Sequence, residues 1–79
     1  MKIQVHLFAG LRELVGEATL AVELPEGATV GEALACLRQQ HQALAGRPFL
    51  SAVNERYAAP EQKLAERDEL ALIPPVSGG

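Results

Sequence analysis

The chain has 79 residues, 48% of them hydrophobic and 4% aromatic, with a formal net charge of −3. This length fits one domain with a core of aliphatic side chains, and the lack of a Lys/Arg cluster disfavours nucleic acid as a partner. The N-terminus shows no signal-peptide pattern and no apolar run is long enough to span a bilayer, so we expect a cytoplasmic protein that does not bind membranes. The single Cys36 cannot form an internal disulfide, which fits a reducing compartment.

Period-two alternation of apolar and polar residues predicts two half-buried strands near the N-terminus, residues 2–8 and 19–24. Phe8 is out of phase with this pattern and falls on the polar face. The residues expected to be buried are Ile3, Val5, Leu7, Leu20, Val22 and Leu24. Residues 10–16 lie between two glycines and are long enough for one or two helical turns. We expect this segment to turn three side chains inward: Leu11, Leu14 and Val15.

The clearest helix signal lies near the middle of the chain. Thr29 can cap a helix, and Glu32 three residues later completes a capping box that satisfies backbone donors of the first turn. Apolar residues then recur at helical spacing, at Val30, Leu34, Leu37 and Leu44. Gly46 and Pro48 stop the pattern, so we predict a helix over residues 30–44.

The second half of the chain predicts two more strands, residues 49–54 and 69–73. The connections are a turn at 54–56, a short extended piece around Tyr57, a loop or 3₁₀ turn over 60–65 anchored by Leu64, and a polar turn at 67–69. This order of elements predicts an α+β fold in which one long helix packs across one face of a small mixed sheet. The first and last strands are expected to be parallel neighbours at its centre.

Residues 74–79, Pro74-Pro75-Val76-Ser77-Gly78-Gly79, are predicted to form an extended tail after a domain of residues 1–73. The two prolines favour an extended path, and the two glycines are thin enough to enter a narrow slot. At roughly 3.3 Å per residue the tail reaches about 20 Å, far enough to place the carboxylate of Gly79 in another protein's active site. That carboxylate can be activated by ATP as an acyl-adenylate and then attacked by a sulfur nucleophile. The alternative is a frayed tail without a function.

An apolar surface is expected beside the exit of this tail. Ile73 falls on the outer face of the last strand, as Phe8 does in the first. If the two strands are parallel neighbours, Phe8 and Ile73 meet there and form a candidate docking surface, with Arg12 as a charged rim contact. Tyr57 is assigned to the same partner-binding set. In the alternative, Phe8 and Ile73 are strand-end residues tucked under a loop.

No residue pattern supports catalysis or cofactor binding by the chain itself. Cys36 has no second Cys and no clear His or acid partner, so we expect a small, buried or half-buried apolar residue, with a redox role as the alternative. His6 and His41 lack the spacing of metal ligands. There is no phosphate-binding glycine loop and no Ser/His/Asp order. Whatever adenylates Gly79 must be another protein, so the chain is expected to be a carried substrate or a donating subunit.

Four segments carry a resemblance to a known family: residues 8–16, 29–34, 52–54 and 68–79. The most specific is the ending, in which an acidic turn and an apolar strand lead into Pro-Pro-Val-Ser-Gly-Gly. Together they resemble the MoaD family, the ubiquitin-like small subunits of molybdopterin synthase, over nearly the whole chain. Two positions depart from the family pattern. Arg67 stands where the family usually has Gly, and Leu72-Ile73 stand where it often has aromatic residues.

The resemblance implies a ubiquitin-like β-grasp fold and a sulfur-carrier role. In this family the terminal glycine, here Gly79, is adenylated by an E1-like activating enzyme that uses ATP, and is converted to a thiocarboxylate. The tail, here residues 74–79, then inserts into the large subunit of molybdopterin synthase, and sulfur passes to cyclic pyranopterin monophosphate. The resemblance also implies that the large subunit supplies the catalytic side chains, while the carrier binds no cofactor of its own.

Three other functions remain open. A sulfur carrier for thiamine, cysteine or tRNA thiolation shares the fold and the Gly-Gly end, although the Pro-Pro-Val-Ser spacer fits the molybdopterin branch better. A protein modifier that becomes joined to lysines shares both features as well. A plain interaction domain would have no chemistry at Gly79.

Overall fold

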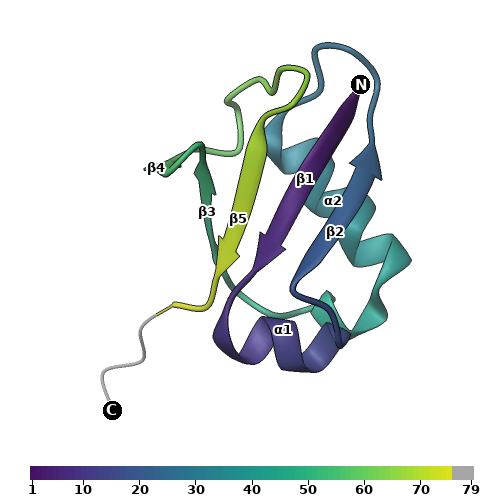
Figure 1. Cartoon of the computed structure of the whole chain (residues 1–79), viewed down its shortest axis with the longest axis vertical. Helices are drawn as coiled ribbons and strands as arrows, with labels where there is room; N and C mark the ends of the chain where they lie inside the picture. Colours follow the sequence, from purple (N-terminus) through teal and green to yellow (C-terminus); the bar gives the residue numbers. More distant parts are fainter. Residues whose placement is uncertain (76–79) are drawn as a thin grey trace.

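The computed structural model describes residues 1–75 (Figure 1). Its elements in chain order are β1 (Lys2–Leu7), α1 (Ala9–Val15), β2 (Thr19–Glu23), α2 (Val30–Gln40), the 3₁₀ helix η1 (Gln42–Leu44), β3 (Leu50–Val53), β4 (Arg56–Tyr57) and β5 (Glu69–Ile73). The strands begin and end within one or two residues of the segments that alternation predicts. Phe8 is the exception in β1, since it caps α1 instead of extending the strand.

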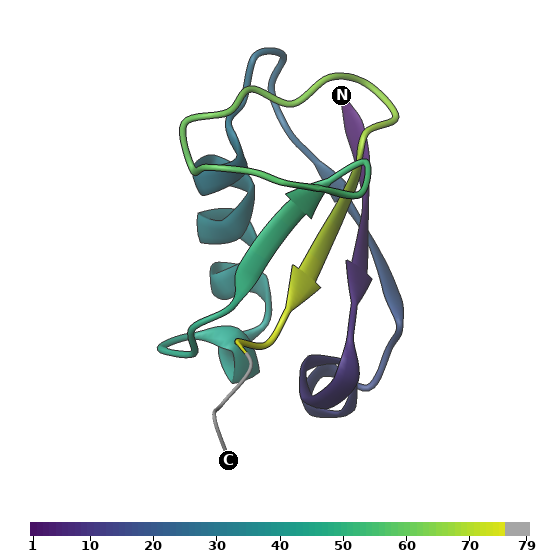
Figure 2. The same ribbon diagram turned by 90° about the vertical axis from the view of Figure 1, so that its left-hand side faces the viewer.

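The strands form one sheet in the order β2-β1-β5-β3-β4. β1 and β5 pair in parallel at its centre, as predicted, and the other pairings are antiparallel. α2 lies across one face of the sheet, and the opposite face has no helix over it (Figure 2). This arrangement confirms the predicted α+β architecture of a mixed sheet with one long helix across it.

The core lies between the sheet and α2 and consists of aliphatic side chains. Alternation places Ile3, Val5 and Leu7 of β1 in it, and all three are buried. The neighbouring strands and helices contribute Leu11, Leu20, Val22, Leu24, Ala28, Val30, Ala33, Leu37, Leu44, Val53, Leu64, Leu70 and Leu72. Within residues 1–75 no polar or charged residue is buried, so the stability of the fold depends on apolar burial.

The capping box of α2 is formed as predicted. The Glu32 N–H donates to Thr29 Oγ1 at 3.2 Å, and the Thr29 N–H donates to Glu32 Oε1 at 2.8 Å. The predicted extent of the helix is wrong, because α2 ends at Gln40 and His41 is extended at φ −128°. The chain changes direction there, so that η1 packs against both α1 and α2 and buries Leu44.

The face of α1 differs from the prediction at one residue. Leu11 is buried and Val15 packs partly buried against the core, whereas Leu14 is 40% exposed. Leu11 and Val15 are four residues apart and share the inward stripe of this seven-residue helix. Leu14 lies at the edge of that stripe, and such a short helix presents only a narrow face to the core.

Non-glycine residues adopt positive φ at three places among residues 1–75: Ala9 (φ 50°) at the start of α1, and two later connections. Asn54 (φ 49°) and Glu55 (φ 72°) form the two-residue loop of the β3–β4 hairpin, and positive φ at both positions is what a type I′ turn requires. Arg67, before β5, has φ 72°. The loop between them is anchored by buried Leu64, as predicted. Among the helices of residues 1–75, none combines the length and the apolar character needed to cross a membrane.

Candidate functional site

The tail begins at the end of a strand that is held on both sides. β5 pairs with β1 on one side and with β3 on the other, and the Phe8 N–H donates to the Leu72 carbonyl at 3.2 Å. After Ile73 the chain continues through half-buried Pro74 and exposed Pro75. The predicted insertion residues Val76, Ser77 and Gly78 and the predicted sulfur-carrying Gly79 lie outside the described residues. The division into a domain of residues 1–73 and a tail therefore stays a prediction.

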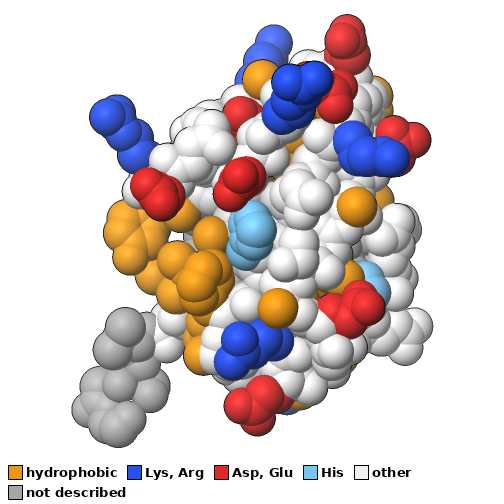
Figure 3. All heavy atoms as spheres, in the orientation of Figure 1, with side chains coloured by type: hydrophobic (Ala, Val, Ile, Leu, Met, Phe, Trp, Pro, Cys, Tyr) orange, Lys and Arg blue, Asp and Glu red, His pale blue; other side chains and the backbone are white. Residues whose placement is uncertain are grey.

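An apolar patch lies beside the base of the tail, on the sheet face that α2 does not cover. Directly paired residues of a sheet share a face, so the pairings of Leu50 with Ile73 and of Ala52 with both Ala71 and Tyr57 place these side chains together. Phe8 is 49% exposed, Leu50 42% and Tyr57 75%. Figure 3 shows hydrophobic side chains gathered on this side of the molecule. We call Phe8, Leu50, Tyr57, Ala71 and Ile73 the outer patch.

The structure thus brings three of the four predicted partner-binding residues to one face. Phe8, Tyr57 and Ile73 belong to the outer patch. Phe8 is not covered by a loop, which excludes the alternative for this residue. Arg12 lies on α1, one helical turn after Phe8, and is exposed at the rim. That these residues bind a partner stays a prediction.

Sequence reasoning missed Leu50. The run Phe49-Leu50-Ser51-Ala52-Val53 is nearly all apolar, so no period-two alternation shows which side chains face outward. The pairing of Leu50 with Ile73 shows that Leu50 faces outward, and this pairing joins segments that lie far apart in the sequence.

A hollow lined by both polar and apolar residues borders the outer patch. It has a volume of about 230 Å³ and is lined by His6, Phe8, Asn54, Glu55, Glu69 and Ala71. His6 Nε2 lies 3.2 Å from Glu69 Oε1 across β1 and β5. Glu55 reaches this rim through the β3–β4 turn. An apolar surface with charged groups at its border fits a partner that is apolar at the centre and charged at the edge.

The other singled-out residues lie away from the outer patch. Cys36 is half-buried against the core, as expected, with its Sγ 3.5 Å from Gln40 Nε2. His41 follows α2, whereas His6 lies on β1. Over residues 1–75, no group of three or more His, Cys, Asp or Glu side chains could hold a metal ion.

Comparison with known proteins supports the resemblance inferred from the sequence. The model of the ThiS family matches residues 5–79. The chain belongs to the ThiS family. It is 38% identical to the molybdopterin synthase sulfur carrier subunit of Arabidopsis thaliana, across 100% of this chain and 84% of that protein. It is also 42% identical to small archaeal modifier protein 1 of Haloferax volcanii, across 92% of this chain and 95% of the modifier.

A solved structure of the same family has the same architecture. The crystal structure of SAMP1 from Haloferax volcanii matches with a TM-score of 0.91 at 37% identity, over 100% of both chains. The predicted ubiquitin-like β-grasp fold and the predicted resemblance to the sulfur carrier subunits of molybdopterin synthase are both confirmed.

Proposed function

We propose that this chain is the sulfur carrier subunit of a molybdopterin synthase and that the carboxyl group of Gly79 carries the sulfur. The observation that carries this proposal is the 38% identity, over the whole chain, to a protein named as such a subunit. The Pro-Pro-Val-Ser-Gly-Gly ending supports it, because a slim glycine end after two prolines suits insertion into a narrow active site.

The proposed chemistry takes place on the backbone carboxylate. An oxygen of the Gly79 carboxylate attacks the α-phosphate of ATP, and pyrophosphate leaves. Sulfur at the sulfide level, HS⁻, then attacks the acyl carbon and AMP leaves, so that the thiocarboxylate forms without a change of oxidation state. ATP is bound and used by an E1-like activating enzyme, so this chain needs no cofactor of its own. The chain contributes the acyl group and a surface that other proteins bind.

The partner that receives the sulfur is the large subunit of molybdopterin synthase. We place its docking on the outer patch, since Phe8, Leu50 and Tyr57, together with Leu14, are the exposed large apolar side chains among residues 1–75. Burying this apolar surface favours association, and aromatic residues are frequent binding anchors. The large subunit supplies the catalytic side chains, and the sulfur passes to cyclic pyranopterin monophosphate. We expect this reaction in the cytoplasm.

A protein modifier is the second candidate, favoured by the 42% identity to small archaeal modifier protein 1. The two functions share adenylation and differ in the nucleophile that follows, which is sulfur for a carrier and a lysine amine for a modifier. Carriers for thiamine, cysteine or tRNA thiolation would differ from the first proposal only in the protein that accepts the sulfur.

Intact mass spectrometry separates these functions. The full chain is incubated with an E1-like activating enzyme, ATP and a sulfur donor, and then with the large subunit. A carrier gains the mass of one oxygen replaced by sulfur, and loses it again when the large subunit and cyclic pyranopterin monophosphate are added. Isopeptide-linked adducts on lysines would support the modifier. A carrier that binds a thiazole synthase and not the large subunit would contradict the molybdopterin assignment.

A further inference from the structure

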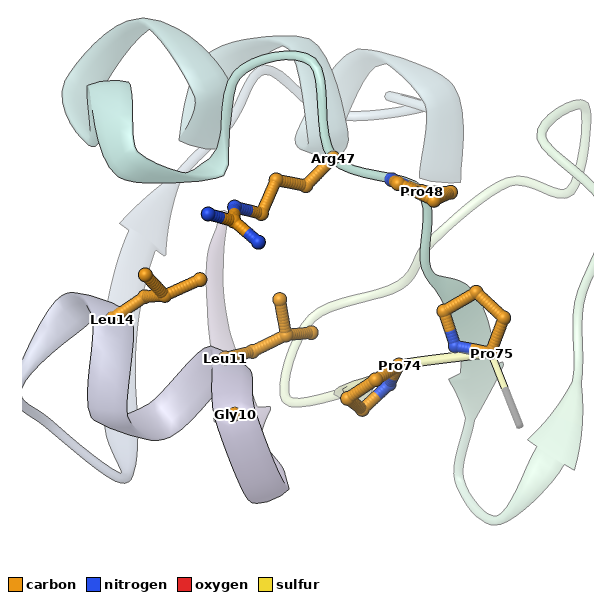
Figure 4. Close-up of a pocket in the computed structure, with 7 residues that line it drawn as sticks. All are labelled: Gly10, Leu11, Leu14, Arg47, Pro48, Pro74 and Pro75. Atoms are coloured by element: carbon orange, nitrogen blue, oxygen red, sulfur yellow. The ribbon is translucent and has the colours of Figure 1, made fainter. Parts of the chain in front are cut away.

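A second surface feature, a groove, lies at the base of the tail and is separate from the outer patch. It has a volume of about 340 Å³ and is lined by Gly10, Leu11, Leu14, Arg47, Pro48, Pro74 and Pro75. Figure 4 shows Leu11, Leu14 and the guanidinium of Arg47 toward one end and the rings of Pro48, Pro74 and Pro75 toward the other. Three segments distant in the sequence therefore meet here: α1, the loop after η1 and the residues after β5.

The walls of this tail-base groove are held in place by the rest of the fold. Leu11 is anchored in the core on the α1 side. On the opposite side, Arg38 Nη2 donates to the Arg47 carbonyl at 3.0 Å, and the Arg47 N–H donates to the Leu44 carbonyl at 3.2 Å. The Arg38 guanidinium also lies 4.4 Å from the centre of the Phe49 ring. A groove whose walls are already fixed loses little conformational entropy when a ligand binds.

The chemistry of the groove is apolar with one positive charge. Leu14 is 40% exposed because it lies at the edge of the inward stripe of α1, and the proline rings add further apolar surface. Within residues 1–75, no carboxylate lies within ion-pairing distance of Arg47. Arginine next to apolar surface is well suited to bind a carboxylate, since its planar fork forms two parallel hydrogen bonds. The ligand that matches is an apolar side chain close to an acidic one.

The groove follows the outer patch along the chain, although the two surfaces share no residue. Ile73 belongs to the outer patch, and Pro74 and Pro75 line the groove. A protein that covers the outer patch and follows the chain beyond Ile73 therefore reaches the groove directly. The charged residues beside the two surfaces differ, because Glu55 and Glu69 line the hollow beside the patch whereas Arg47 lines the groove.

We propose that the tail-base groove binds a segment of the molybdopterin synthase large subunit that inserts one aliphatic or aromatic side chain beside Leu11 and Leu14 and pairs an Asp or Glu with Arg47. This inference rests on the proposed function, and it adds a second contact to the outer patch. Because the segment contacts Pro74 and Pro75, it fixes the base of the tail while the subunits are joined. The tail is thus positioned by its partner as well as by β5.

Titration calorimetry of the full chain with the purified large subunit tests the groove. Arg47→Glu and Leu14→Asp are each expected to weaken binding about tenfold or more, as the loss of a central anchor does. Both side chains are exposed, so the fold is expected to persist. Lys63→Glu makes the same charge change in the loop between β4 and β5, at the other end of the molecule (Figure 1), and is expected to leave binding within about twofold. Leu14→Met, which keeps the volume, should retain affinity.

The outcomes separate this inference from the proposed function. If the unmodified chain does not bind the large subunit, the proposed function fails. If it binds and both groove variants bind equally well, the groove proposal alone is overturned. The groove proposal is also overturned if the variants weaken binding to the E1-like activating enzyme and leave binding to the large subunit unchanged. It is overturned as well if the free chain is a dimer in sedimentation and Leu14→Asp dissociates it. NMR signals of residues 76–79 that shift in free Arg47→Glu would assign the groove to the chain's own tail and overturn it as well.

Discussion

The two faces of β5 both carry apolar residues, but they differ in how far these residues are buried. Leu70 and Leu72 point toward α2 and are fully buried, whereas Ala71 and Ile73 point to the other side and stay partly exposed. A strand at the edge of a core normally alternates apolar with polar residues. In β5 the alternation is between apolar side chains that fold the domain and apolar side chains that are available to a partner. Hydrophobicity alone therefore does not identify the core residues of β5. The sheet register determines which of its apolar side chains remain exposed.

The largest effect is expected at Gly79, the proposed sulfur-carrying residue at the end of the chain that leaves β5. Deleting Gly79, or adding one alanine after it, should abolish sulfur transfer because the reacting group is then absent or displaced. Intact mass after activation measures this directly. Circular dichroism and binding to the large subunit should remain unchanged, since neither face of β5 is altered. Transfer at the normal rate by a lengthened chain would contradict the proposed chemistry.

The inner face is tested by Leu72→Ala. Removing a fully buried leucine is expected to lower the free energy of unfolding by ~2–5 kcal/mol, which is a large share of the stability of a domain this small. Chemical denaturation measures it. Ile73→Ala on the same strand is the matched control and should cost clearly less, because part of that side chain is already in water. Equal losses would mean that the two faces do not differ as described.

The outer face is tested by Phe8→Ala. Loss of a half-exposed aromatic anchor is expected to weaken binding of the large subunit by about tenfold or more, without a matching loss of thermal stability. Ile73→Asp should act in the same direction, because it places a charge in the centre of the outer patch. Phe8→Leu keeps most of the apolar area and should recover much of the affinity. Unchanged affinity in titration calorimetry would remove the outer patch from the interface.

The smallest effect, a change in the free energy of unfolding, is expected at Arg67, which precedes β5 and belongs to neither of its faces. Its φ of 72° lies in the left-handed region, where a Cβ is unfavourable. Arg67→Gly should raise the free energy of unfolding by up to about 1 kcal/mol, since relief of this strain is partly offset by the entropy of glycine in the unfolded chain. Arg67→Ala keeps the Cβ and should give no such gain. A stabilisation by alanine equal to that by glycine would point to the arginine side chain instead of the backbone.

Local signals in the sequence predicted the parts of this fold that local physics determines. Alternation gave β1 and β2, and the Thr29–Glu32 spacing gave the start of α2. The end of α2 was not predictable in this way, because the break at His41 places η1 against α1, which precedes it by many residues. Gly46 and Pro48 marked only the last point at which the helix could stop.

The candidate site was predictable to a smaller extent. Phe8 and Ile73 were found because each is out of phase with the apolar alternation of the strand predicted around it, which is a local signal. Leu50 and the exposure of Leu14 depend on the pairing of β3 with β5 and on the packing of α1, so no local pattern reveals them. The groove at Arg47 requires three separate segments to meet, and it becomes visible only in three dimensions.

The central position of β5 also has a mechanical consequence. A pull on the chain beyond Ile73 runs along β5, whose backbone hydrogen bonds to β1 on one side and to β3 on the other are loaded in shear. Bonds loaded in this geometry must break together, whereas an edge strand can be peeled away one bond at a time. In the proposed function the tail enters other proteins, and this geometry would then protect the fold against being unravelled from that end.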